Sequence, residues 1–155
     1  MSTRCQVAVI EQGKNLIITL YHHTDGYPEF IIPKIFEAYS WEGDEWVKTK
    51  AGKVTSLLCW SDPGVFEPEN SHMLHLDITY YYRLYCGELM DDHANWDVEI
   101  YKKKSLTEDQ MYALLKVDIL DQIKRYQTES IDNILRDDFD LIGQRQNIQD
   151  IIKTY

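Results

Sequence analysis

A chain of 155 residues with 44% hydrophobic and 27% charged side chains predicts one soluble globular unit that is long enough to bury a core. Its formal net charge of −10 repels a phosphate backbone and no basic stripe offsets it, so we expect no direct binding to nucleic acid. A protein partner fits this charge better, including a basic nucleic-acid-binding protein. Tyrosine is abundant, at 11 residues, and it favours half-buried faces and contact surfaces.

Cysteine usage and the apolar runs predict the compartment. Cys5, Cys59 and Cys86 are an odd number without a CxxC spacing, so neither a disulfide framework nor a zinc motif is indicated. The first residues do not resemble a signal peptide, and no apolar run approaches the roughly 20 residues of a membrane span. We therefore expect a cytoplasmic protein with no cofactor, no metal and no membrane contact.

The first half of the chain predicts a hairpin followed by helices. Residues 5–11 and 15–21 are two β-rich runs, and the short break between them contains Gly13, which is typical of a β-hairpin. Residues 33–41 have apolar side chains at helical spacing, and residues 46–60 indicate a second helix that Gly52 weakens. Residues 61–71 are rich in Pro, Gly, Asp and Ser and predict a loop.

The second predicted hairpin joins residues 74–85 and 96–104 through a loop at 86–95. Apolar and polar side chains alternate along both segments, so that Tyr82, Leu84, Val98 and Ile100 share one face. The opposite side of each strand carries charged residues and tyrosines. This pattern predicts a sheet with one core face and one polar-aromatic face.

From residue 105 the apolar spacing becomes helical. Thr107 and Gln110 form a capping-box pattern, a stripe runs from Met111 to Tyr126, and residues 131–139 indicate a further helix before Gly143. The sum is an α+β fold of about four antiparallel strands in two hairpins, with helices packed on one face and a helical C-terminal extension. We expect a core domain at 1–105 and an extension at 106–155 that packs on the core or forms a homodimer.

The stretch TLYHHTDGYPEFIIPKI, residues 19–35, concentrates side chains that can do chemistry. The hairpin register brings Arg4 opposite Tyr21, His22 or His23, next to the turn at Asp25 and Gly26. In one interpretation the corner is structural, and Asp25 pairs with Arg4 and caps the turn. In the other, Arg4 holds an anionic group and His23, oriented by Asp25, transfers protons.

Two further constellations carry less weight. Cys5 lies close to the same corner and is a candidate nucleophile, although a cysteine in an apolar run is more often buried. His72, His75 and Asp77 imitate the spacing of metal ligands, but on a strand His72 and His75 face opposite ways.

The start of the chain resembles a widespread group of small proteins from phages, plasmids and bacterial genomes. Members begin Met-Ser/Gly-Thr-Arg and carry Tyr-x-His-x-Asp-Gly-Tyr-Pro-Glu some twenty residues later. Thr3 and Arg4 match the first motif, and the second is matched by Tyr21, His23, Asp25, Gly26, Tyr27, Pro28 and Glu29. The resemblance covers about the first 40 residues and implies no particular activity. Its mobile-element setting implies a counter-defence or host-interaction role by association.

Two functions follow as hypotheses. The first is a non-catalytic binding or inhibitor module that acts on a protein partner or small ligand through Arg4, Tyr21, His23, Asp25, Tyr27 and Glu29. The second is a small hydrolase or nucleotide-processing enzyme that uses Arg4, His23 and Asp25. The sequence contains no complete catalytic set, so the first is favoured.

Overall fold

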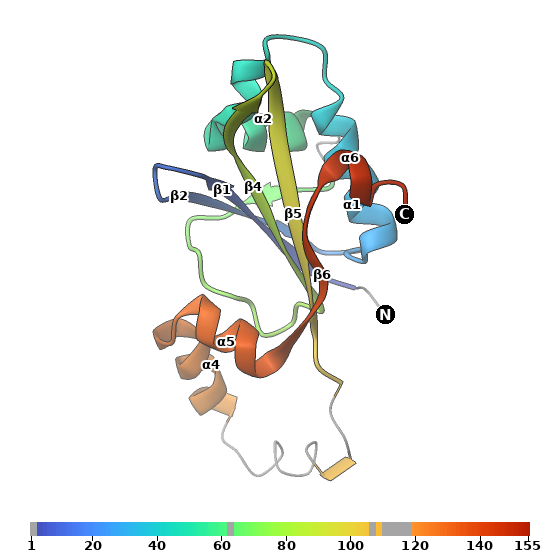
Figure 1. Ribbon diagram of the computed structural model, residues 1–155. Coiled ribbons are helices and arrows are strands. Elements are labelled where there is room, and N and C mark those ends of the chain that lie inside the picture. The colour runs from blue at the N-terminus through green and yellow to red at the C-terminus, as the bar shows by residue number, and fades with distance from the viewer. Residues whose placement is uncertain (1–2, 62–63, 106–107, 110–118) are drawn as a thin grey trace.

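The computed structural model describes residues 3–61, 64–105, 108–109 and 119–155. The chain forms a six-stranded sheet in the order β3-β2-β1-β4-β5-β6, with helices around it (Figure 1). The strands are β1 (Cys5–Glu11), β2 (Leu16–His22), β3 (Glu67–Pro68), β4 (Tyr80–Met90), β5 (His93–Lys103) and β6 (Phe139–Asn147). The helices are α1 (Pro28–Tyr39), η1 (Glu45–Thr49), α2 (Ala51–Ser61), α4 (Ile119–Thr128), α5 (Ile131–Asp138) and α6 (Ile148–Ile151). None of the described helices is both long enough and apolar enough to cross a membrane.

The predicted first hairpin is confirmed. β1 and β2 are antiparallel with Cys5 opposite His22 and Glu11 opposite Leu16. The turn uses positive φ values at Gly13 and Asn15, which are residue types that tolerate this conformation. The pairing of Cys5 with His22 sets Arg4 opposite His23, which is one end of the range predicted for Arg4.

The second hairpin exists, but its boundaries differ from the prediction. β4 begins at Tyr80 and continues to Met90, so residues 86–90, expected in a loop, are strand. Asp91 and Asp92 both have positive φ and make a two-residue turn between Met90 and His93. This tight turn lets the strands pair almost to their ends.

The prediction of about four antiparallel strands was wrong in two respects. β1 pairs with β4 in parallel, with Cys5 opposite Tyr80, so the sheet is mixed. β3 and β6 add a strand at each edge. A two-residue strand and a polar edge strand leave little local pattern, because their partners lie far away in the chain.

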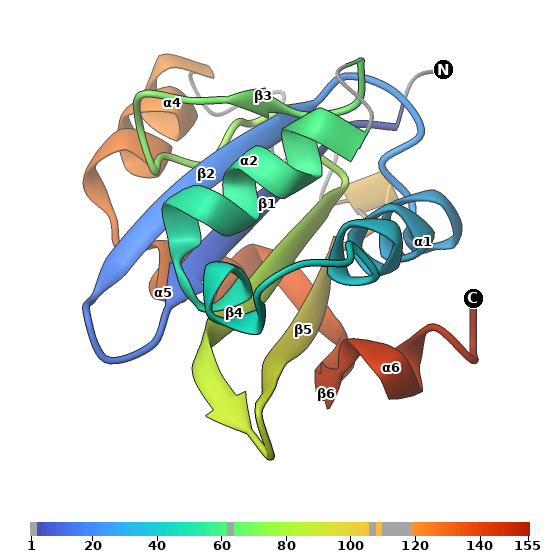
Figure 2. The same cartoon turned by 90° about the horizontal axis from the view of Figure 1, so that it is seen from above.

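One face of the sheet, here called the apolar face, is closed by α1, α2, η1 and α6. Its side chains are almost entirely buried and include Val7, Val9, Leu20, Tyr82, Leu84, Trp96, Val98 and Ile100. Two of the buried polar side chains bond to backbone carbonyls: the Trp96 indole donates to the Lys48 carbonyl at 2.7 Å, and the Tyr39 hydroxyl to the Ala94 carbonyl at 2.7 Å. Figure 2 shows α2 lying across β1 and β2, with α6 beside β6.

The other side, the polar-aromatic face, is partly covered by α4, α5 and the segment 69–79. Leu74, Ile78, Tyr81, Tyr126, Ile134, Leu135 and Phe139 form a second buried cluster there with Ala8 and Tyr21. The helices predicted in the first half of the chain thus pack on one face as expected, and the C-terminal helices α4 and α5 cover the other. The reason for this second cover is that Tyr81 and Tyr101 lie on the predicted polar side yet give α5 an aromatic surface to cover.

The C-terminal region is not wholly helical. α4 and α5 match the predicted helices, but β6 then joins β5 and α6 returns to the apolar face. Residues from both sides of the expected boundary at 105 thus share one sheet. The capping box at Thr107 and Gln110 and the stripe at Met111, Leu114 and Leu115 lie outside the described residues.

Candidate functional site

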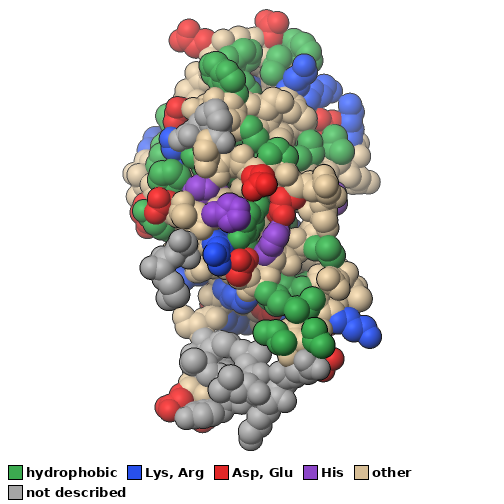
Figure 3. All heavy atoms as spheres, turned by 180° about the vertical axis from the view of Figure 1, so that it is seen from behind, with side chains coloured by type: hydrophobic (Ala, Val, Ile, Leu, Met, Phe, Trp, Pro, Cys, Tyr) green, Lys and Arg blue, Asp and Glu red, His purple; other side chains and the backbone are tan. Residues whose placement is uncertain are grey.

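Titratable side chains gather on the polar-aromatic face where β2 ends and the segment 69–79 crosses the sheet. Figure 3 shows histidine, carboxylate and arginine or lysine side chains side by side on this surface. We call the group the histidine–carboxylate cluster, and its members are Arg4, Gln6, Tyr21, His23, Glu67, Glu69, His75 and Asp77.

The hairpin register explains how Arg4 and His23 reach this cluster. Extending the pairing of Cys5 with His22 by one residue sets Arg4 opposite His23, and alternation puts both on the side of Gln6 and Tyr21. The Arg4 guanidinium, however, pairs with Asp77, with Nη1 3.1 Å from Oδ2. The expected pairing of Arg4 with Asp25 is therefore replaced by one with a residue more than fifty positions away.

Tyr21 occupies the centre of the cluster. Its hydroxyl donates to Asp77 Oδ2 at 3.2 Å, and its ring stacks on His75 and meets His23 edge-on, each at a centroid distance of 4.5 Å. Burial, followed by the charge of Asp77, raises the pKa of Tyr21 to about 12. Tyr21 thus remains a protonated donor at neutral pH.

The segment 69–79 is anchored by Gln6, a fully buried polar residue of β1. Its amide nitrogen donates to Glu69 Oε1 and to the Met73 carbonyl, each at 3.0 Å, and its amide oxygen accepts from the His75 backbone N–H at 3.0 Å. Glu69 also pairs with His75, at 2.6 Å between Oε2 and Nε2. The first part of the strand predicted from residue 74 is absent because the His75 backbone N–H bonds to the Gln6 side chain and the Leu76 carbonyl accepts from Lys103 Nζ. Backbone pairing with the neighbouring strands begins only at Thr79.

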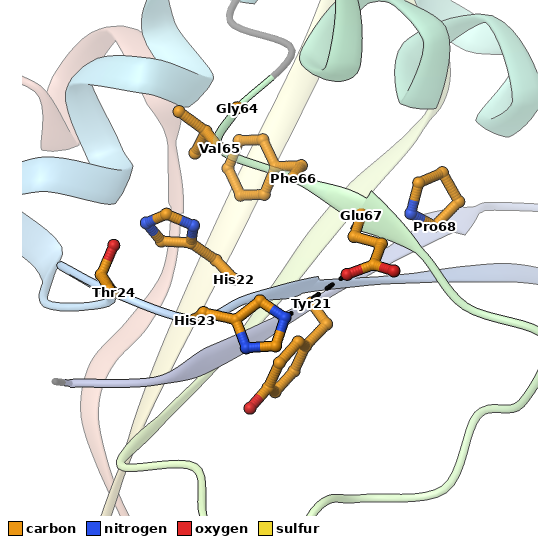
Figure 4. Close-up of a pocket in the computed structure, with 9 residues that line it drawn as sticks. All are labelled: Tyr21, His22, His23, Thr24, Gly64, Val65, Phe66, Glu67 and Pro68. Carbon is orange, nitrogen blue, oxygen red and sulfur yellow. Dashed lines mark ion pairs between the residues drawn. The ribbon is translucent and has the colours of Figure 1, made fainter.

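A hollow of about 490 Å³ opens beside Tyr21, His23 and His75 and is bounded by residues 67–71. Figure 4 shows an adjoining hollow of about 310 Å³ and the ion pair at its edge, in which His23 Nε2 lies 3.4 Å from Glu67 Oε2. Both side chains are mainly exposed, at 66% and 70%. His22 points to the opposite side of the strand, where it is buried and stacks on Phe30.

An apolar groove of about 250 Å³ continues from this hollow. It shares Glu69, Ser71 and His75 with the hollow. Its other lining residues are Met73, Leu74, Leu76, Ile123, Tyr126 and Gln127. A charged hollow and an apolar groove therefore form one continuous surface.

The Asp25–Gly26 turn lies apart from the cluster and is held by the backbone of the N-terminal strand. The Gly26 N–H donates to the Thr3 carbonyl at 2.8 Å, and its own carbonyl accepts from the buried Tyr82 hydroxyl at 2.6 Å. A Cβ at Gly26 would lie 2.8 Å from the Cys5 Cβ, so only glycine allows this approach. Asp25 has a φ of 53° and forms the turn itself.

The other predicted residues of this stretch lie at the start of α1. Tyr27 is the exposed residue before Pro28, and Glu29 is an exposed acid in the first turn. The charge of Asp25, with some burial, raises the pKa of Tyr27. The structure thus joins Arg4, Tyr21 and His23 in the cluster and leaves Asp25, Tyr27 and Glu29 outside it.

Cys5 is fully buried on the apolar face, and burial raises the pKa of its thiol far above the ordinary value. That environment is typical of an inert core cysteine rather than a nucleophile. Within the described ranges, no group of three or more His, Cys, Asp or Glu residues is arranged to hold a metal ion.

Five members of the cluster were not expected from the sequence as ligand contacts: Gln6, Glu67, Glu69, His75 and Asp77. One sequence signal could have pointed to these residues: the polar side of the alternating pattern at 74–85 carries His75 and Asp77. Nothing local connects these residues to Arg4. No protein-family model, curated protein or solved structure matches the chain.

Proposed function

We propose that the protein is a non-catalytic binding module that recognises a basic segment of a protein partner through the histidine–carboxylate cluster. The observation that carries the proposal is the exposed Glu67 carboxylate at the edge of the hollow, with Glu69 and Asp77 behind it. Three carboxylates face one guanidinium and two imidazoles in a chain of net charge −10. A lysine or arginine of a partner complements that charge.

The ion pairs within the cluster can be replaced by ion pairs with a partner at little cost in free energy. His23–Glu67 and Arg4–Asp77 have side-chain exposures between 42% and 70%, and exposed pairs contribute little to folding. A partner cation can therefore take over a carboxylate with only a small loss of stability in the module.

The adjoining groove defines a second requirement for the partner. Met73, Leu76, Ile123 and Tyr126 offer apolar and aromatic contacts next to Glu69. A bulky apolar residue close to the basic one would bury its side chain there, and burial supplies binding free energy that a charge pair at the rim does not. We infer a partner segment that combines arginine or lysine with leucine-like side chains.

The geometry favours binding over the hydrolase alternative. Arg4 pairs with Asp77 and His23 with Glu67, whereas Asp25 belongs to the exposed turn, so the three proposed catalytic groups have separate partners. The motifs shared with phage and plasmid proteins suggest a role in the interplay with host defence, and that setting stays a prediction.

Labelled model peptides test the proposal. One contains Arg and Leu, a second replaces Leu by Ala, and a third replaces Arg by Gln. We expect saturable binding of the first peptide by fluorescence anisotropy and weaker binding of the other two. Glu67→Gln should weaken binding of the Arg–Leu peptide about fivefold, as expected for one exposed charge pair of roughly 1 kcal/mol.

Glu88→Gln is the matched control, since the change removes the same charge from an exposed glutamate of β4. Glu88 follows Cys86, which lies opposite Glu11 at the other end of β1 from the cluster. Equal effects of the two substitutions would show that only the overall charge matters. That result, or the absence of saturable binding, would refute a specific site at the cluster.

A further inference from the structure

A second group of cations lies on the polar-aromatic face, away from the histidine–carboxylate cluster. A cavity of about 360 Å³ between α5 and strands β4, β5 and β6 is lined by Arg83, Lys104 and Arg136. Two acids, Asp132 and Asp140, and the apolar side chains of Tyr101, Leu135, Phe139 and Leu141 complete its wall. Cations outnumber acids here, in contrast to the chain as a whole.

Arg83 is the most buried charged residue of this wall. Its side chain is 19% exposed, and its guanidinium carbon lies 6.0 Å and 5.7 Å from the ring centroids of Tyr81 and Tyr101. The aromatic rings fix the plane of the guanidinium and exclude water from its faces. This arrangement holds a rigid donor at the base of the cavity.

The hydrogen bonds of Arg83 are incomplete. Nη2 pairs with Asp132 Oδ1 at 2.5 Å, whereas Nε is buried and has no hydrogen-bond partner among the described residues. A buried unsatisfied donor costs about 1–3 kcal/mol, and guanidinium groups commonly bind carboxylate or phosphate through two parallel hydrogen bonds. An anion with two oxygens can satisfy Nε, which the hydrogen bond from Nη2 to Asp132 does not.

Asp132 is well placed to give way to such an anion. It lies in the first turn of α5 and its side chain is 80% exposed, so its carboxylate can return to water. Lys104 and Arg136 are exposed cations on the cavity wall, and Arg136 forms a surface ion pair with the neighbouring Asp137, at 3.3 Å. Both can therefore contact a ligand at modest cost.

We propose that this cavity binds a small organic anion, in which a phosphate or carboxylate group engages Arg83, Lys104 and Arg136 and an apolar body packs on Tyr101 and Phe139. The cavity volume lies in the range of small-molecule sites, and its mixture of cations and apolar side chains matches a ligand with both parts. When the ligand is absent, the Asp132 carboxylate pairs with the Arg83 guanidinium, and it therefore competes with the ligand for this group. The site is independent of the proposed protein partner.

Phenyl phosphate is a suitable probe, with inorganic phosphate as the comparison that lacks the apolar body. We expect saturable NMR shifts confined to residues around the cavity, with phenyl phosphate binding more tightly than phosphate. Lys104→Gln combined with Arg136→Gln should weaken binding about tenfold or more, because two cations are lost. Lys14→Gln combined with Lys153→Gln removes the same charge from distant exposed positions and should leave binding unchanged.

Asp132→Asn separates a ligand site from a purely structural ion pair. If Asp132 competes with the ligand, Asn should tighten binding of phenyl phosphate severalfold. If Arg83 only ties α5 to the sheet, the substitution should lower the melting temperature without tightening any binding. Absent or non-saturable binding by the wild type, equal effects of the two double substitutions, or weaker binding by Asp132→Asn would each overturn the proposal.

Discussion

The apolar face and the polar-aromatic face of the same sheet are closed by different interactions. On the apolar face, α1, α2 and α6 bury aliphatic and aromatic side chains almost completely, and the polar groups of Tyr39 and Trp96 bond to backbone carbonyls. On the polar-aromatic face, cover is partial and depends on charged contacts, such as Arg125 with Asp138 and Arg83 with Asp132. Burial stabilises the first face. The second face retains cavities and exchangeable ion pairs, and both candidate binding sites lie there.

The largest expected effect is on the apolar face. Ile100→Ala removes a fully buried side chain of β5 and leaves a cavity, so the free energy of unfolding should fall by about 2–5 kcal/mol. Urea denaturation followed by circular dichroism measures the change. Leu89→Ala, at a position 51% exposed, is the control and should change stability by less than about 0.5 kcal/mol. Similar losses for both would contradict the assignment of the core to this face.

An intermediate loss of stability is expected from a substitution where α4 and α5 meet. Asp138 accepts from Arg125 at 2.8 Å and from the Tyr126 hydroxyl at 2.7 Å. Asp138→Asn should cost about 1–3 kcal/mol at neutral pH, because it weakens a charge-assisted network. Asp137→Asn, on the neighbouring and more exposed residue, should cost less.

The pH dependence of this effect follows from Asp138. Burial raises the pKa of its carboxyl, but hydrogen bonds and charge from Arg125 and Tyr126 outweigh burial, so the pKa is lower than usual. The stability that a lowered pKa adds is complete above the unfolded value of about 4 and is lost as the pH falls toward the native value. The difference between wild type and Asp138→Asn should therefore shrink below about pH 4 in thermal melts, and a constant difference would contradict the network.

The smallest effect is expected in the histidine–carboxylate cluster. Arg4→Gln breaks the ion pair with Asp77, but both side chains are more than 40% exposed, so the loss of stability should stay below about 1 kcal/mol. His23→Ala should have a similarly small effect for the same reason, with Lys153→Gln as a control for the loss of an exposed surface charge. A loss above about 2 kcal/mol for Arg4→Gln would show that this pair is a structural lock, and it would weaken the binding proposal.

Local patterns sufficed where a segment and its partner adjoin in the chain. The β1–β2 hairpin, the alternation at Tyr82, Leu84, Val98 and Ile100, and the helices at α4 and α5 were all predicted from spacing. The segment 74–79 also alternates, but its apolar residues Leu74 and Ile78 join the second buried cluster while His75 bonds to Gln6. An alternating pattern states which side chains are buried. It does not state whether the backbone pairs with a strand.

In the candidate site too, local sequence patterns predicted some contacts, and the rest depend on the tertiary structure. The register of a tight hairpin was enough to bring Arg4 near His23, since adjacent strands with a short turn have few alternative pairings. Arg4, however, binds Asp77 rather than Asp25, and Tyr21 contacts His75. These contacts join residues more than fifty positions apart, and no spacing in the sequence connects them.

By itself the amino-acid sequence determined which side chains are apolar at which period, and hence the hairpins, the main helices and the strand residues of the apolar face. Only the tertiary structure decided that β1 lies parallel to β4, that β6 completes the sheet, and that the segment 69–79 brings Glu69, His75 and Asp77 to Tyr21. The physical reason is that hydrophobic periodicity acts between neighbours in the chain. Strand order and the pairing of charges depend instead on which distant surfaces exclude water together.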